Sequence, residues 1–146
     1  MDLLTTPMQS KDSIQALAIR LRPGSDLRRE LQELVKQEKI SAGTIIGAVG
    51  SLSKVCLRFA GREEHTILPG RHEILSLSGM LGEDGIHLHM MVANSEGECK
   101  GGHLVDGCCV YTTLELAIAL LPNIQFQRVL DQETGYKELF VASVSE

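Results

Sequence analysis

Three histidines in the second half of the chain have the spacing of a metal site. His87 and His89 lie two residues apart, and the positions around them are apolar: Ile86, Leu88, Met90 and Val92. On a strand, residues i and i+2 share a face and stand about 6.6 Å apart, so two imidazoles can lean onto one ion. His103 is the candidate third ligand. Three histidines suit zinc and leave one coordination position for water.

The register of the hairpin between these histidines decides whether they meet. A two-residue loop at Glu96-Gly97 would place His103 opposite Met90, on the wrong face. A three-residue loop with Gly97 in the left-handed conformation would place it opposite His89. A bulge at Gly101-Gly102 would make the same correction. The three histidines therefore meet only if the pairing of the two strands is shifted by an odd number of residues, or if ligands come from a neighbouring subunit.

An HxH pair by itself is also typical of two half-exposed histidines on a strand that bind no metal. His103, beyond a glycine-rich hairpin, favours the metal interpretation. His65 follows Arg62-Glu63-Glu64 and is expected in a solvated loop.

Other polar residues are weaker candidates for chemistry. Glu115 lies in an apolar run, where it would orient a ligand histidine, act as a base beside metal-bound water, or be a solvated or interface carboxylate. Arg58 and Arg71 could bind a substrate carboxylate, although exposed arginine is common. Cys108 and Cys109 alternate on a strand and cannot share a metal. All four cysteines are expected as reduced thiols.

The elements that must position these residues follow from the periodicity of the sequence. Ser25 or Asp26 caps a helix expected over 26–39, because Leu27, Leu31, Leu34 and Val35 recur at helical spacing. Alternating patterns predict strands elsewhere. These are Ser13–Leu21, Thr44–Leu52, Lys54–Ala60, Thr66–Leu68, His72–Leu81, Ile86–Asn94, Gly101–Val105, Cys109–Leu121, Gln125–Leu130 and Lys137–Val141.

These elements indicate an α+β fold with one main helix and a mostly antiparallel or mixed sheet that closes on itself. Leu114–Leu121 fits both periods and is alternatively a helix. We expect a flexible N-terminus over 1–12, a single domain over 13–142 and a C-terminal tail over 143–146.

Composition excludes several classes of protein. The chain has 146 residues and a formal net charge of −5, and aromatic residues make up only 3%. The one dense basic group is Arg20, Arg22, Arg28 and Arg29. Nucleic-acid binding by this chain alone is therefore disfavoured. No signal peptide or membrane-spanning run is present, so a cytoplasmic location is expected.

The ordered set of motifs resembles the plant-and-prokaryote conserved (PPC) domain. The matching stretches are Arg20-Leu21-Arg22-Pro23-Gly24-Ser25-Asp26, Gly47-Ala48-Val49-Gly50-Ser51-Leu52, Gly70-Arg71-His72-Glu73-Ile74-Leu75, His87-Leu88-His89 and Gly101-Gly102-His103-Leu104. The resemblance covers about residues 13–142. It implies a sheet-rich homotrimer with a divalent metal, usually zinc, on His87, His89 and His103. The fold class also looks similar to that of alpha-acetolactate decarboxylase.

The chain departs from the family pattern in three places. His72 stands where phenylalanine is usual in Gly70–Leu75, the segment with which plant members engage other nuclear proteins, so that contact is in doubt. Asn94 replaces the usual aspartate after the HxH strand. No AT-hook (Arg-Gly-Arg-Pro) is present, so minor-groove binding does not carry over.

These observations support three functional hypotheses. The first is a homotrimeric zinc-binding module that recognises a small molecule, such as a small acid, or a protein partner. The second is a zinc-dependent hydrolase or lyase acting on a small acid. The third, a DNA-associated protein, is disfavoured by the acidic charge and the missing hook.

Overall fold

One long, bent strand organises the whole sheet. The structure is a computed structural model that describes residues 13–144; the predicted flexible segment 1–12 lies outside the described residues. The sequence predicts two strands over 44–60, but the structure has one, β2 (Gly43–Arg58). Register shifts at Ile45/Gly47 and between Gly50 and Lys54 bend β2 without ending it, as β-bulges do.

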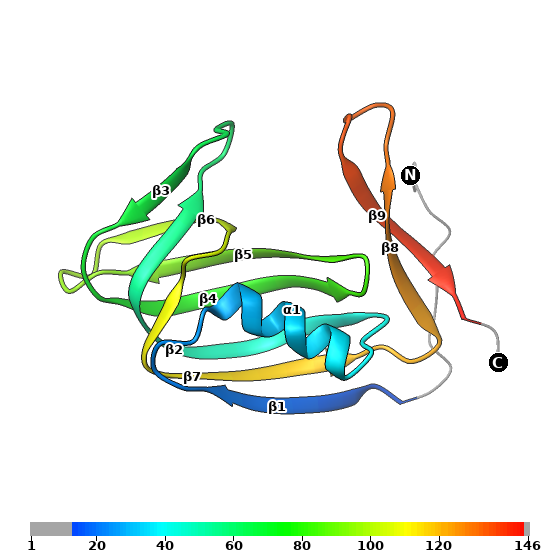
Figure 1. Ribbon diagram of the computed structural model, residues 1–146, viewed down its shortest axis with the longest axis horizontal. Coiled ribbons are helices and arrows are strands. Elements are labelled where there is room, and N and C mark those ends of the chain that lie inside the picture. Colours follow the sequence, from blue (N-terminus) through cyan, green and yellow to red (C-terminus); the bar gives the residue numbers. More distant parts are fainter. Residues whose placement is uncertain (1–12, 145–146) are drawn as a thin grey trace.

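The main sheet is antiparallel and has the strand order β1-β7-β2-β4-β5-β6. Its other strands are β1 (Gln15–Leu21), β4 (His72–Gly82), β5 (Gly85–Ala93), β6 (Cys99–Leu104) and β7 (Cys109–Leu120), with β3 (His65–Leu68) paired to the end of β2 (Figure 1). The alternative helix at Leu114–Leu121 is wrong, because β7 pairs with both β1 and β2.

The last strand of the sheet, β6, also pairs with the central strand β2. β6 pairs with β5 and also with the end of β2, through Leu57 opposite Leu104 and Arg58 opposite His103. The strands β2, β4, β5 and β6 therefore form a closed circuit of pairings. This closure places Arg58 beside a predicted metal ligand.

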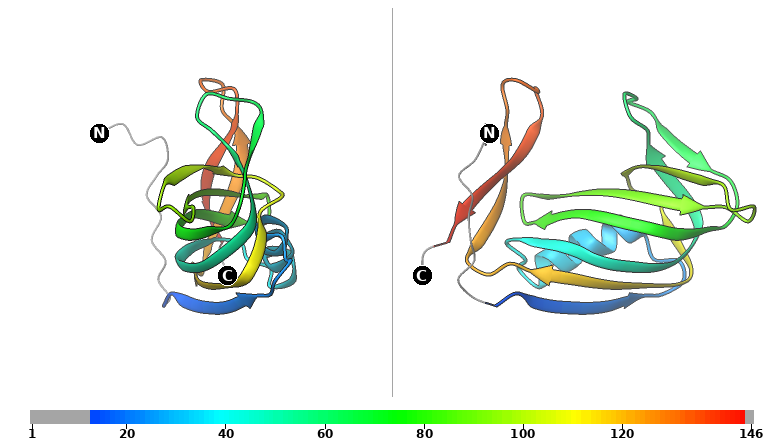
Figure 2. Two further views of the ribbon diagram at one scale, coloured as in Figure 1. Left: turned by 90° about the vertical axis from the view of Figure 1, so that its left-hand side faces the viewer. Right: turned by 180° about the vertical axis from the view of Figure 1, so that it is seen from behind.

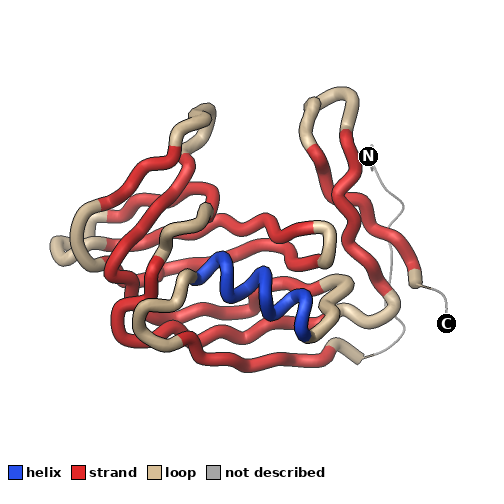
Figure 3. The backbone as a smooth tube through the Cα atoms, viewed as in Figure 1, coloured by secondary structure: helices blue, strands red, loops and turns tan. Residues whose placement is uncertain are grey.

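The predicted helix is confirmed as α1 (Leu27–Gln37), the single helix among residues 13–144 (Figure 3). The Asp26 carboxylate caps it by accepting hydrogen bonds from the amides of Arg28 and Arg29. Its second oxygen accepts from the Gly107 amide at 2.7 Å, which ties the helix to the β6–β7 loop. Leu27, Leu31 and Val35 are buried in the core. Viewed from behind, the opposite face of the sheet has no helix over it (Figure 2).

A second, two-stranded sheet is formed by β8 (Ile124–Leu130) and β9 (Lys137–Ser143). Its base is fixed to the body, because Ile124 and Phe126 pack with Ala42 and the Phe126 amide donates to the Ser41 carbonyl. This hairpin and the β2–β3 hairpin rise on either side of β4 and β5 (Figure 1). We call them the β8–β9 arm (124–143) and the β2–β3 arm (55–68).

Two further predictions concern the chemistry of the chain. All four cysteines are free thiols, as expected. Nowhere in the described part of the chain is a helix both long and apolar enough to cross a membrane.

Candidate metal centre

His87 and His89 point away from the core, as the alternation of β5 predicts. Their neighbours Leu88 and Met90 are each 2% exposed, whereas both histidines are exposed. Because β4 pairs Met80 with His87 and Ser78 with His89, the histidines share the outer face of the sheet with these residues.

The hairpin that joins β5 to β6 brings His103 onto the same face. His103 lies directly opposite His89. The Asn94 amide donates to the Glu98 carbonyl at 3.1 Å and the Gly97 amide to the Asn94 carbonyl at 3.0 Å, so three residues, 95–97, form the loop. Gly97 adopts φ 78°, the left-handed position that this loop requires. The three-residue alternative is therefore confirmed, and the pairing is regular through Gly101 and Gly102 without a bulge.

Asn94 stabilises this loop with its side chain. Its Oδ1 accepts hydrogen bonds from the amides of Glu96 and Glu98, both at 2.9 Å. An aspartate would offer the same acceptor, so the departure from the family pattern leaves the loop intact. The asparagine Nδ2 additionally donates to the Glu98 carboxylate at 2.8 Å.

The three imidazoles converge. One ring nitrogen from each lies within 4.8 Å of the others, and the Nε2 atoms of His87 and His89 are 3.2 Å apart. Two nitrogens bound tetrahedrally at about 2.05 Å from one zinc ion would be separated by about 3.3 Å. The His87–His89 pair thus already has the spacing of two zinc ligands, and a ring nitrogen of His103 lies within 4.8 Å of both.

His103 has an unsatisfied ring. Its Nδ1 is the one buried side-chain nitrogen or oxygen in residues 13–144 that lacks a hydrogen-bond partner. Leaving a buried polar atom unpaired costs about 1–3 kcal/mol. A nitrogen lone pair that no protein group satisfies fits a ring that binds an ion.

Burial and nearby charges favour the neutral form of two of these rings, His87 and His103. Burial is the largest cause that lowers the pKa of His103 to about 4, followed by the positive charges of Arg58 and His87. Burial and His89 likewise lower the pKa of His87. Metal binding requires neutral imidazole, so both rings are in the required state at neutral pH.

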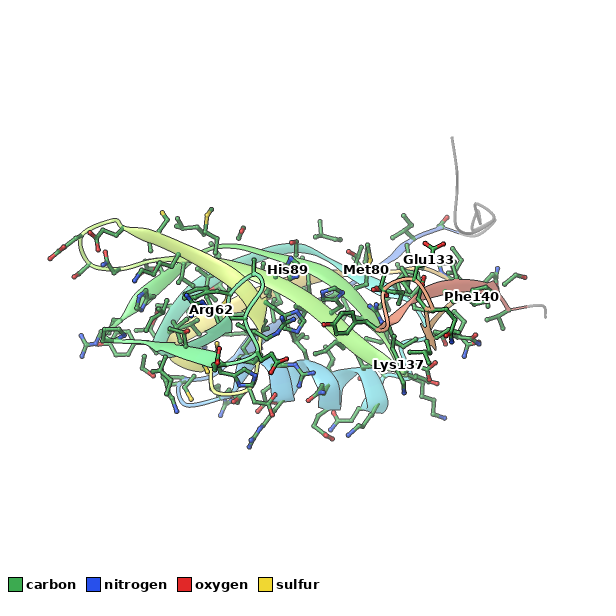
Figure 4. All side chains as sticks on the ribbon, turned by 90° about the horizontal axis from the view of Figure 1, so that it is seen from above. Arg62, Met80, His89, Glu133, Lys137 and Phe140 are labelled. Carbon is green, nitrogen blue, oxygen red and sulfur yellow. The ribbon has the colours of Figure 1, made fainter. Side chains whose placement is uncertain are left out.

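A cleft of about 640 Å³ opens beside the cluster. Figure 4 shows His89 between Arg62 of one arm and Lys137 of the other. The lining comes from the β2–β3 arm, the β4–β5 turn and the start of β5, the end of β6, and the β8–β9 arm: Arg58, Gly61, Arg62, Glu63, Asp84, Gly85, Ile86, His87, His103, Arg128, Tyr136, Lys137 and Glu138.

The structure separates the two arginines considered for anion binding. Arg58 lines the cleft, where its guanidinium donates to the Arg62 carbonyl at 3.3 Å. The Arg71 guanidinium instead stacks 4.1 Å from the centre of the Tyr111 ring, on a different part of the surface.

Glu115 is not brought to the histidines. It lies on β7 opposite Arg20 on one side and Val49 on the other. Two strands, β2 and β4, separate β7 from β5. This placement does not support contact with an ion bound by the same chain, and a catalytic role for Glu115 stays a prediction.

The segment Gly70–Leu75 forms the turn before β4 and its first residues. His72, which stands where the family pattern has phenylalanine, is 6% exposed, and its Nδ1 lies 3.1 Å from the Gly70 carbonyl. Glu73 and Leu75 are exposed. A contact between this segment and a partner stays a prediction.

Sequence reasoning missed Arg62, Arg128 and Lys137 in the cleft. Their local sequence is that of ordinary exposed loop and strand positions. The two arms that bring them together are more than fifty residues apart along the chain, and no spacing signal connects them.

The fold and site define a small antiparallel-sheet domain with one helix and a tri-histidine cluster on its outer face. The chain belongs to the Plants and Prokaryotes Conserved (PCC) domain family, which it matches over residues 8–122. The motifs of the sequence had indicated this family.

Three relatives are similar to this chain over most of its length. A 134-residue stretch is 45% identical to the bifunctional protein GlmU of Synechococcus sp. (strain JA-3-3Ab), covering 92% of this chain. The chain spans only about a fifth of the length of that protein, 22%. A hypothetical protein of Salmonella enterica is 40% identical, with a TM-score of 0.88 over 92% of this chain and 99% of its own. A protein of Archaeoglobus fulgidus described as metal-containing is 25% identical, with a TM-score of 0.80 over 93% and 99%.

Proposed function

We propose that this protein is a metal-binding module that holds one divalent ion per chain on His87, His89 and His103 and binds a small molecule in the adjacent cleft. The observation that carries the proposal is the convergence of three ring nitrogens within 4.8 Å. Zinc is the first candidate, because it is commonly bound by three histidines. Imidazole also suits copper, nickel and iron. The metal-containing relative from Archaeoglobus fulgidus supports the same assignment.

Three protein ligands leave a tetrahedral ion one further position. His87 and His103 both line the cleft, so that position would be accessible to a molecule bound there. The open cleft favours a ligand over a purely structural ion, whose site would be closed by a fourth side chain.

The proposal includes assembly as a homotrimer. Central strands expose large hydrophobic side chains on the sheet face that lacks a helix: Ile46, Val49, Leu75, Met80 and Met91. Such residues on a central sheet are typical of a protein interface. We call this set the apolar face.

Metal content measured by elemental mass spectrometry on untagged protein tests the proposal. The wild type should carry close to one zinc per chain, and His89→Ala should carry less than a tenth of that. His65→Ala is the matched control, since His65 is an exposed histidine outside the cluster. A wild type without metal, or equal zinc in His89→Ala, would refute the site.

An enzyme is the second candidate, and Glu138 favours it. This β9 carboxylate lines the cleft, and its negative charge acts on His87. A carboxylate near a metal-bound water is the arrangement of zinc hydrolases and lyases. If the protein turns over a small acid, Glu138→Gln should lose the activity and keep the metal, whereas equal activity in Glu138→Gln would exclude this base.

The third candidate, DNA association, finds little support in the basic group near the helix. Arg28 and Arg29 both pair with Asp106, at 2.8 and 3.1 Å. Arg20 donates to the Thr113 hydroxyl. Binding to duplex DNA that weakens steeply with salt would support this candidate.

A further inference from the structure

The cleft beside the histidines concentrates positive charge in an acidic protein. The chain has 14 lysines and arginines against 19 aspartates and glutamates. Four of those cations line one cleft: Arg58 and Arg62 on the β2–β3 arm, and Arg128 and Lys137 on the β8–β9 arm. Each arm therefore supplies two.

These four cations lack carboxylate partners. Over residues 13–144 the ion pairs within 4.0 Å involve Arg28, Arg29 and Lys36, and none involves a cation of the cleft. The cleft does contain the carboxylates Glu63, Asp84 and Glu138. Asp84 accepts from the backbone amide of Arg128, and Glu138 from the Thr134 hydroxyl. Neither neutralises a guanidinium or ammonium group.

The charge balance favours an anionic ligand. Four cations against three carboxylates leave one positive charge, and a divalent ion on the neutral histidines would raise this to three. Arginine guanidinium groups match the planar geometry of carboxylates. A cleft of about 640 Å³ has the size of a small-molecule site.

We propose that the cleft binds a small organic dicarboxylate, with one carboxylate on each arm and the middle of the molecule beside the histidine cluster. The proposal deepens the proposed function and rests on it for the ion. Arg58, paired with His103 across β2 and β6, and Arg62 hold one end. Arg128 and Lys137 hold the other. The exposed Tyr136 ring offers an apolar contact for the chain between them.

The test is calorimetric titration of the purified protein, with and without added zinc, using dicarboxylates from malonate to pimelate and butyrate as the single-acid control. One chain length should bind at least about tenfold more tightly than butyrate, because it adds a second charge-assisted contact. Hydrogen exchange should show that this diacid protects the amides of residues 124–143 more strongly than butyrate does.

Single-arm variants make the test specific. Arg58→Gln on one arm and Lys137→Gln on the other should each weaken the best diacid about tenfold. Each should weaken butyrate no more than about twofold, because a single acid can use the remaining arm. Lys100→Gln, an exposed lysine of β6 outside the cleft, is the control and should change neither.

Measuring zinc in every sample keeps the two proposals apart. If the wild type holds zinc and no diacid binds more tightly than butyrate, the dicarboxylate proposal is overturned and the metal site stands. If the wild type holds no zinc and the diacid still binds through both arms, the metal site fails and the anion cleft stands. If the arm variants bind the diacid as the wild type does, the proposed contacts are wrong.

Discussion

His89 and His103 lie directly opposite each other across β5 and β6, because an odd number of residues separates the two strands. Side chains alternate along a strand, so a shift of the pairing by one residue would turn His103 to the opposite face. The candidate metal site therefore depends on the pairing register of a hairpin whose loop contains none of the three histidines.

This dependence predicts the effect of shifting the register. Deleting Lys100 from β6 leaves the 95–97 loop unchanged, so it should move His103 opposite Met90 and reduce the zinc content at least tenfold. Lys100→Ala keeps the length of β6 and should keep the zinc. Elemental mass spectrometry measures the metal, and circular dichroism confirms that both variants are folded. Full zinc in the deletion variant would show that the strand corrects its register with a bulge.

Gly79 permits the close approach of β4 to β5. It adopts φ 150°, and an added Cβ would collide with the backbone carbonyl of His87. Gly79→Ala should lower the free energy of unfolding by at least about 2 kcal/mol, because the strands must separate or the backbone must strain. Gly47→Ala, on β2 with open space around it, should change stability by less than about 0.5 kcal/mol. Urea denaturation monitored by circular dichroism measures both, and similar losses would contradict this account.

We expect the stability of the protein to fall slightly in acid because of Asp106. The hydrogen bond from Arg28 is the main cause that holds the pKa of Asp106 below its ordinary value of 3.8. A lowered folded-state pKa stabilises the protein above the ordinary pKa, and this contribution disappears as the pH falls through the folded-state value. Because the carboxylate is 42% exposed, the contribution should stay below about 1 kcal/mol.

Asp106→Asn should therefore be less stable than the wild type at pH 7 and nearly equal to it at pH 2.5. Urea denaturation at the two pH values measures the difference. Salt at 1 M should shrink the difference at pH 7. A constant difference at both pH values would mean that shape, not charge, explains the effect.

The apolar face predicts the behaviour of the assembly. Val49 is 60% exposed on a central strand, so Val49→Glu should convert a trimer into monomers by placing a charge in the interface. Ile67→Glu is the matched control, because Ile67 is 61% exposed but lies on β3, outside that face. Sedimentation velocity gives the mass of each. A monomeric wild type, or a trimeric Val49→Glu, would contradict the proposed interface.

Local pattern was sufficient for the helix and for the orientation of the first two candidate ligands. Asp26 and the leucines after it indicate α1 because capping and helical spacing act within a few residues. The two-residue alternation places His87 and His89 together on the outer face for the same reason. The long β2 was predicted as two strands because its bulges interrupt the alternation, although its pairing continues.

By itself, the sequence determined the family, the helix and the presence of two histidines on one face, since each follows from neighbouring residues. Only the tertiary structure decided among the three alternatives for His103. It also placed Arg58 beside His103 through the β2–β6 pairing and gathered the cations of the two arms into one cleft. These relationships join residues far apart in the chain. They depend on how strands pack and pair, which local periodicity does not encode.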